Sequence, residues 1–186
     1  PGTSMGPGAS IRALSITTLD NIPPTIACPA NIVDVTDIGL CAADNTVTAV
    51  AADNCSVSVA YILTGAATGS GSGNSFTYDF PKGTTTVTFT ATDPAPSSST
   101  ATCAFTVTVT DNQPPMVSCP ADKTVNTGDD GGYNCTTTAT GLALTATDNC
   151  PGLITSYTLS GATTGSGNNP IPASQLFNIG TTIITY

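Results

Sequence analysis

The sequence contains no histidine, glutamate or tryptophan, and its basic residues are only Arg12, Lys82 and Lys123. Twelve aspartates outweigh them and give a formal net charge of -9. A surface with so few lysines and arginines repels phosphate groups, so we expect neither nucleic acids nor anionic membranes as partners. No apolar run approaches the roughly 18 residues of a membrane span, so we expect no membrane insertion by this segment.

The missing histidine and glutamate also argue against an enzyme. General acid and base catalysis usually uses His, Glu or an Asp with a perturbed pKa. The aspartates of this chain lie mostly in turn contexts, and its serines have no histidine to activate them. We therefore expect no catalytic activity.

Cysteine is the reactive residue type that the chain does contain, with seven copies. A zinc site needs clustered thiolates or histidines nearby, whereas these cysteines stand singly at long intervals. The spacing favours disulfides and therefore an oxidising compartment. We expect a secreted, surface-bound or periplasmic protein, and place this one outside the cell or on its surface.

One phrase is written twice in the chain. LDNIPPTIACPA (19–30) and TDNQPPMVSCPA (110–121) lie 91 positions apart. Later motifs repeat in the same order: Cys41 with Cys135, ADNC (52–55) with TDNC (147–150), GAATG (65–69) with GATTG (161–165), and FPKGTTTVTF (80–89) with FNIGTTIITY (177–186). A period near 91 is a whole domain, because solenoid repeats run at roughly 20 to 50 residues. The sequence therefore predicts a tandem array of small domains.

Residues within each repeat alternate with the period of two that is typical of strands. In TTTVTFTATD (84–93) the apolar Val87, Phe89 and Ala91 alternate with threonines, and CAFTVTVTD (103–111) has the same pattern. Glycine-rich breaks separate such segments, and no stretch has a helical period. Six or seven short strands in about 90 residues indicate an all-β chain of tandem immunoglobulin-like, antiparallel β-sandwich domains.

The order of these motifs resembles that of the HYR (hyalin repeat) domain. The chain reads DN-x-PP-x-x-x-CP, then DNC, then F-x-x-GTT-x-V-x-x-x-ATD, then C-x-F-x-V-x-V. The pattern is similar to the four-cysteine form found in large bacterial surface proteins. The resemblance implies an immunoglobulin-like sandwich, extracellular arrays and a role in adhesion or spacing, without catalysis.

The resemblance also divides the chain. Residues 1–20 correspond to the last loop and strand of a preceding domain, 21–111 to a complete domain, and 112–186 to a second domain without its last strand. The missing strand carries the fourth cysteine, which explains the odd number of seven. We expect a window onto a longer array. The alternative is that Ser10 to Leu19 of one copy completes the second domain of another by strand addition.

Four cysteines in a complete domain allow three pairings, and spacing does not select one. If successive strands alternate in direction, Cys28 and Cys103 begin strands at the same end. Family members with two cysteines keep this pair, so the resemblance implies Cys28 with Cys103 and leaves Cys41 with Cys55. Cys28 with Cys41 remains the rival, because Cys41 begins a strand whereas Cys55 follows its far end.

These pairings also set the number of free thiols. The complete domain should have none. In the second domain Cys135 with Cys150 corresponds to Cys41 with Cys55. Cys119 or Cys150, whichever loses its partner, should then be the only free thiol of the chain.

Acidic and amide side chains gather, by the same strand directions, where the chain enters each domain. Oxygen ligands on converging loops suit Ca²⁺, which prefers six to eight of them. The alternative is that Asp and Asn only cap turns. The candidate calcium ligands are Asp20, Asn21, Asp53, Asn54 and Asp93 in the first domain, and Asp111, Asn112, Asp148 and Asn149 in the second, where the equivalent of Asp93 falls beyond Tyr186.

The sequence thus predicts a structural segment of an extracellular fibre or cell-surface adhesin. Its domains would act as spacers stapled by disulfides and stiffened by calcium, with neighbouring domains or identical copies as partners. Pro23-Pro24 and Pro114-Pro115 would keep the joints extended. The alternative is a glycan-binding module, which the low aromatic content disfavours. The adhesion target cannot be read from the residues.

Overall fold

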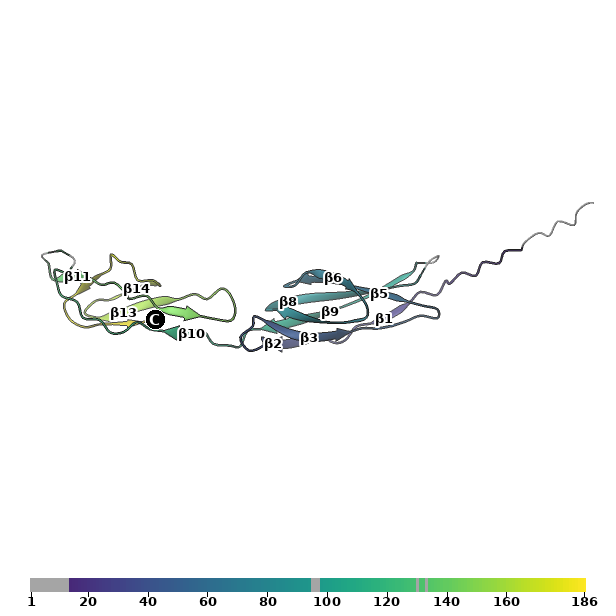
Figure 1. Cartoon of the computed structure of the whole chain (residues 1–186), viewed down its shortest axis with the longest axis horizontal. Helices are drawn as coiled ribbons and strands as arrows, with labels where there is room; N and C mark the ends of the chain where they lie inside the picture. The colour runs from purple at the N-terminus through teal and green to yellow at the C-terminus, as the bar shows by residue number, and fades with distance from the viewer. Residues whose placement is uncertain (1–13, 95–97, 130, 133) are drawn as a thin grey trace, which may run out of the picture.

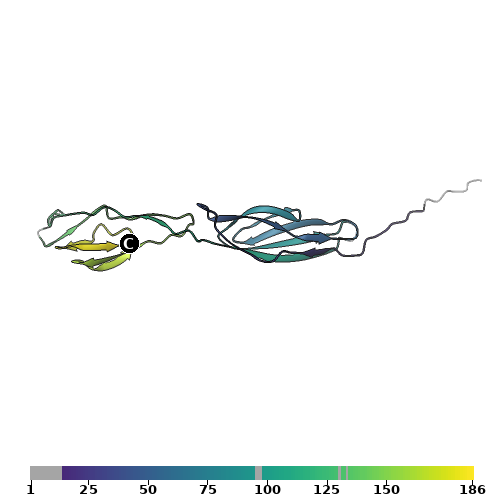
Figure 2. The same ribbon diagram turned by 90° about the horizontal axis from the view of Figure 1, so that it is seen from below.

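The computed structural model describes residues 14–94, 98–129, 131–132 and 134–186. The described residues form strands and connecting loops, and they contain no helix that could cross a membrane. The strands gather into two elongated units that follow one another along the long axis (Figures 1 and 2). The first unit comprises β1 to β9 and the second β10 to β16.

One layer of the first unit is a five-stranded sheet with the strand order β2-β9-β8-β5-β6. Its longest contact is the antiparallel pairing of β8 with β9, which runs from Gly83 opposite Val109 to Thr92 opposite Thr100. The strands of this sheet are β2 (Ile32–Val35), β5 (Ser58–Gly65), β6 (Gly69–Ser72), β8 (Gly83–Thr92) and β9 (Thr100–Thr110).

The pairing of β2 with β9 is parallel, which corrects the expectation of a wholly antiparallel sandwich. The strand before β2 lies in the opposite layer, so the chain crosses between layers and β2 runs in the same direction as β9. The Asn31 side chain anchors this crossing, because its Oδ1 accepts a hydrogen bond from the Thr106 amide at 2.9 Å.

Two antiparallel pairs form the other layer of the first unit. They are β1 (Thr25–Ala27) with β4 (Val50–Ala52), and β3 (Ala42–Thr48) with β7 (Ser75–Pro81). The buried core lies between the layers and contains Phe80 and Val47 from one layer and Phe89, Phe105 and Val107 from the other. The first unit is therefore an all-β, immunoglobulin-like sandwich, as predicted.

The alternation in the sequence determines which side chains reach this core. Val87, Phe89 and Ala91 of β8 are completely buried, whereas the threonines between them face outwards and stay partly exposed. Because the pairing of β8 with β9 sets Val87 opposite Phe105, the two strands present one continuous apolar face.

The second unit repeats four of the strand pairings of the first. In chain order its strands are β10 (Met116–Ser118), β11 (Thr136–Thr138), β12 (Thr145–Thr147), β13 (Ser156–Gly161), β14 (Gly165–Asn168), β15 (Leu176–Asn178) and β16 (Thr182–Thr185). β10 pairs with β12 as β1 does with β4, β11 with β15 as β3 does with β7, and β14-β13-β16 follows the order β6-β5-β8. Its buried core is Tyr157, Leu159, Ile171 and Phe177.

The repeated GA-[AT]-TG motif has a backbone reason in both units. Gly65 and Gly161 have φ angles of 101° and 94°, in the left-handed region that favours glycine. A Cβ on Gly65 would also meet the carbonyl oxygen of Thr84, and one on Gly161 would meet that of Thr181. Only glycine fits at these two positions.

Little of the prediction that residues 1–20 form a loop and a strand can be tested. Residues 1–13 lie outside the described part of the chain, and residues 14–19 form no strand. The apolar side chains of Leu14, Ile16 and Leu19 are 85%, 79% and 65% exposed.

Candidate functional site

Three aspartates converge where the chain enters the first unit. Asp20 lies before β1, Asp53 directly after β4, and Asp93 directly after β8. One carboxylate oxygen from each lies within 4.8 Å of the others. Asp93 is buried, with 1% of its surface exposed, and the other two are partly buried. We call these three residues the entrance cluster; the predicted strand directions do bring them together.

Several carboxylate oxygens of the entrance cluster are not satisfied by the protein. Oδ2 of Asp20 and both oxygens of Asp53 are buried and have no hydrogen-bond partner among the described residues. Buried carboxylate oxygens are costly unless a donor or a cation compensates them. The set of three converging carboxylates therefore has the chemistry of a cation site, and hard oxygen ligands suit Ca²⁺ or Mg²⁺.

Neighbouring groups hold Asp20 in place. Its Oδ1 accepts hydrogen bonds from the Ile22 amide at 3.1 Å and from the Asn54 side-chain amide at 3.3 Å. A hydrogen bond from the Cys55 thiol, followed by that from the Ile22 amide, lowers the pKa of Asp20. The same thiol contact, burial and the charges of the three aspartates raise the pKa of Cys55. Asn54 thus reaches the cluster as a donor, while Asn21 is exposed.

A second acidic group lies between the units but has different surroundings. Asp111, Asp148 and Cys150 also bring ligand atoms within 4.8 Å of one another. Here Lys82 forms an ion pair with Asp111, with 3.3 Å between Nζ and Oδ2. The Asp148 carboxylate accepts a hydrogen bond from the Cys150 amide at 2.9 Å. The hydrogen bond from the Gln113 amide, and then Lys82, lower the pKa of Asp111.

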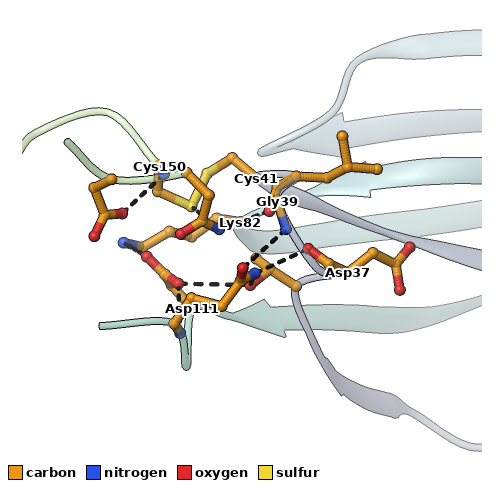
Figure 3. Close-up of a disulfide and its surroundings, with 11 residues drawn as sticks. Asp37, Gly39, Cys41, Lys82, Asp111 and Cys150 are labelled. Carbon is orange, nitrogen blue, oxygen red and sulfur yellow. Dashed lines mark hydrogen bonds and ion pairs between the residues drawn. A yellow bond between two sulfur atoms is a disulfide. The ribbon is translucent and has the colours of Figure 1, made fainter. Parts of the chain in front are cut away.

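A disulfide joins the two units at this place. Cys41 precedes β3 of the first unit, Cys150 follows β12 of the second, and their Cα atoms lie 4.8 Å apart across 109 residues of sequence. Figure 3 shows this bridge beside Lys82 and Asp111. We call this bridge, together with the side chains of Lys82, Asp111, Gln113 and Asn149 around it, the joint.

Hydrogen bonds reinforce the joint on both sides of the bridge. The Asn149 side chain donates to the Leu40 carbonyl at 2.7 Å. Gln113, in the linker, accepts from the Gly39 amide at 2.8 Å and donates to the Asp37 carbonyl at 2.9 Å. The loop from Asp37 to Cys41 is therefore held by the linker and by the second unit together. Asn112 is exposed.

The structure corrects part of the predicted disulfide pattern. Cys28 and Cys103 are bonded, with 5.7 Å between their Cα atoms, in agreement with the predicted pair. The Cys41–Cys55 pairing is wrong, because these residues lie at opposite ends of the first unit and Cys41 reaches Cys150 instead. Since Cys41 does not bond Cys28, the rival pairing is wrong too.

The free thiols differ from prediction for the same reason. Cys150 is bonded across the joint, so its predicted pairing with Cys135 is also wrong. Cys55, Cys119 and Cys135 are free and exposed, whereas the sequence predicts one free thiol in the chain and none in the first unit. The expectation assumed that each domain closes its own disulfides.

Sequence reasoning missed Gln113 and Lys82 as parts of the joint. A signal for them was present in the repeat, because the equivalent residues are Ile22 and Ile179. This difference marks the two positions as unlike between otherwise similar repeats, but it does not identify the residues that Gln113 and Lys82 contact.

Comparison with known proteins agrees with the fold of the first unit. The family model of the HYR domain matches residues 19–109, which include β1 to β8 and nearly all of β9. No curated protein matches the chain. Residues 19–109, which fold as the immunoglobulin-like first unit and contain the Cys28–Cys103 bridge, therefore match the HYR domain family.

Proposed function

We propose that this chain is a structural segment of an extracellular fibre or cell-surface adhesin, in which HYR-type units act as stapled spacers. The family is one of extracellular repeats with adhesion-like roles, and disulfides fit an oxidising environment. The observation that carries the proposal is the Cys41–Cys150 bridge between successive units. A covalent bond there restricts bending of the joint, which is what a spacer requires.

We further propose that residues 112–186 are a second HYR-type domain without its last strand, following a complete domain at 21–111. The repeated strand pairings support this division. Pro114 and Pro115, which follow Gln113, would keep the linker extended.

Calcium at the entrance cluster is part of the same proposal. The unpartnered oxygens of Asp20 and Asp53 fit a cation, which would draw the entering segment, the loop after β4 and the end of β8 together. The acidic group at the joint fits a cation less well, because Lys82 already compensates Asp111. Asp148 also accepts a hydrogen bond from the Cys150 amide, and Asn149 donates one to the Leu40 carbonyl. We therefore assign the calcium role to the entrance cluster first.

The glycan-binding alternative has less support. Sugar-binding surfaces usually present aromatic faces to solvent. None of the Phe and Tyr residues in the described part of the chain is fully exposed. Tyr61 stacks on Phe76 with 3.8 Å between ring centroids, at the edge of the core.

Small-angle X-ray scattering of the whole chain tests the spacer. The intact protein should scatter as one elongated particle with a narrow size distribution. C41S/C150S, and the same variant with Gln113→Ala, should broaden that distribution because the joint can bend. C135S is the matched control, since it removes a cysteine away from the joint. Equal distributions for all four proteins would remove the proposed role of the bridge.

A further inference from the structure

Cys55 occupies the same place in the first unit as Cys150 in the second. Each follows an Asp-Asn pair and a strand that pairs with the first strand of its unit, β4 with β1 and β12 with β10. In both places the preceding Asn side chain lies beside the sulfur. The Asn54 nitrogen is 3.4 Å from Cys55 Sγ, and the Asn149 nitrogen is 3.7 Å from Cys150 Sγ. Cys55 thus has the local arrangement of a joint cysteine.

Cys135 occupies the place of Cys41. Cys41 directly precedes β3, which pairs with β7. Cys135 directly precedes β11, which pairs with β15 in the same way. Cys55 and Cys135 are both free and exposed. Cys55 follows β4, whose last residue pairs with the first residue of β1. β1 lies at the outer end of the first unit, and β11 lies at the outer end of the second unit (Figure 1). The chain therefore has one closed joint and the two halves of another at opposite ends.

A second feature makes these two ends complementary. Gln113 and Lys82, which serve the closed joint, are replaced by Ile22 at the entrance of the first unit and by Ile179 at the far end of the second. Ile22 is 54% exposed and Ile179 is 68% exposed. Both positions change together from polar to apolar. If the two ends met in the geometry of the closed joint, both isoleucines would lie at the interface, where contact with the other copy would cover apolar surface.

We propose that Cys135 of one copy and Cys55 of a second copy form the same disulfide as Cys41 and Cys150, and so link copies head to tail. This inference rests on the proposed spacer function and names the bond by which its copies connect. The second copy contributes one of the two sulfurs, so each free end is incomplete alone. In the closed joint Lys82 forms an ion pair with Asp111. In the linked joint the equivalent residues are Ile179 of one copy and Asp20 of the other, so Asp20 would have no such ion pair.

The bond forms by oxidation of two thiols and needs an oxidant, which is a low-molecular-weight disulfide such as glutathione disulfide. The Cys135 thiolate attacks this disulfide and releases one glutathione thiol, leaving a mixed disulfide. The Cys55 thiolate then attacks the Cys135 sulfur and releases the second glutathione. Two protein thiols are oxidised, one disulfide is reduced to two thiols, and the two protons pass to the released thiolates.

A redox titration of the C119S variant tests the link, because it leaves only Cys55 and Cys135 free. The whole chain is incubated at high concentration in a glutathione buffer, then alkylated and separated without reductant. We expect a ladder of dimers, trimers and larger species. C119S/C55S and C119S/C135S should stay monomeric under the same conditions. Single-cysteine variants that dimerise as readily as C119S would overturn the proposal.

Peptide mapping of the ladder identifies the bonds. Random collision of the two thiols gives the Cys55–Cys135 pair only twice as often as either like pair, Cys55–Cys55 or Cys135–Cys135. We expect at least about a tenfold excess of Cys55–Cys135, because complementary ends raise the effective concentration of the two sulfurs. An excess near twofold, or no linked species, would refute the inference. If Cys41–Cys150 maps as intact in that case, the spacer proposal survives; if it is absent, both fall.

The isoleucine contact has its own readout. Ile179→Asp places a charge at the proposed interface, beside the acidic entrance of the next copy, and should slow the formation of the Cys55–Cys135 link about tenfold. Ile62→Asp is the control, because Ile62 is exposed to a comparable extent, 54% against 68% for Ile179, but lies on β5. Equal slowing by both variants would show that the ends do not recognise each other.

Discussion

The Cα atoms of Cys41 and Cys150 lie 4.8 Å apart although 109 residues separate them in the chain. This proximity exists only because the second unit begins where the first unit ends. The bridge therefore reports on the joint between the units and contributes to it. Beside it, Gln113 and Asn149 form hydrogen bonds to the loop before β3. The covalent bond and the hydrogen bonds therefore both restrain bending between the two units.

Thiol titration gives the most direct check of the disulfide pattern. The folded chain without reductant should show three free thiols per molecule, from Cys55, Cys119 and Cys135. Closure within each domain would leave one. C150S should raise the number to four, because Cys41 loses its partner while the three others stay free. A value of one in the unmodified monomer would contradict the cross-unit bridge.

Calcium should bind to the chain through the entrance cluster of the first unit. Isothermal titration calorimetry of the whole chain should give a dissociation constant at or below about 1 mM, the range of extracellular sites. Asp53→Asn should weaken binding at least tenfold, because both oxygens of Asp53 are buried without a partner. Asp148→Asn is the matched control, and it should change the constant little, since its carboxylate already accepts from Cys150.

A stability measurement gives the same site a second test. Calcium at about 100 times its dissociation constant should stabilise the first unit by about 2.7 kcal/mol, and EDTA should reverse the shift in melting temperature. Asp53→Asn should abolish the shift. Absence of heat up to several millimolar calcium, with no shift in melting, would leave the cluster without the proposed ion.

The two disulfides should differ in what they stabilise. C28A/C103A removes the bridge that ties the end of β1 to β9 within one unit, across 75 residues. It should lower the free energy of unfolding of that unit by about 2 to 4 kcal/mol. C41S/C150S should leave that unfolding free energy nearly unchanged, because its bridge lies between units. Urea denaturation followed by far-ultraviolet circular dichroism separates the two cases, and equal losses would contradict them.

The sequence was sufficient for the fold because local patterns decide it. The alternation around Phe89 and Phe105 sets the faces of β8 and β9, and the strand directions that follow bring Asp20, Asp53 and Asp93 together. The joint could not be derived in this way. Spacing does not distinguish a partner within a domain from one in the next domain, so the sequence does not predict that Cys41 bonds Cys150. The parallel β2 was missed because a change of layer has no periodic signal.

Glycine substitutions in the second unit test whether the repeated turn is built as the structure shows. Gly161 has a φ of 94°, and a Cβ there would meet the Thr181 carbonyl oxygen. Gly152 has a φ of 101°, with nothing within 4 Å of an added Cβ. Both alanine variants bear the cost of a positive φ, about 1 to 2 kcal/mol, but only Gly161→Ala adds a backbone clash. It should therefore lower the unfolding free energy of the second unit clearly more than Gly152→Ala does, as measured by thermal unfolding. Equal losses would mean that β13 and β16 do not approach each other at this turn, which would also remove the likeness to Gly65 on which the repeat of the two units partly rests.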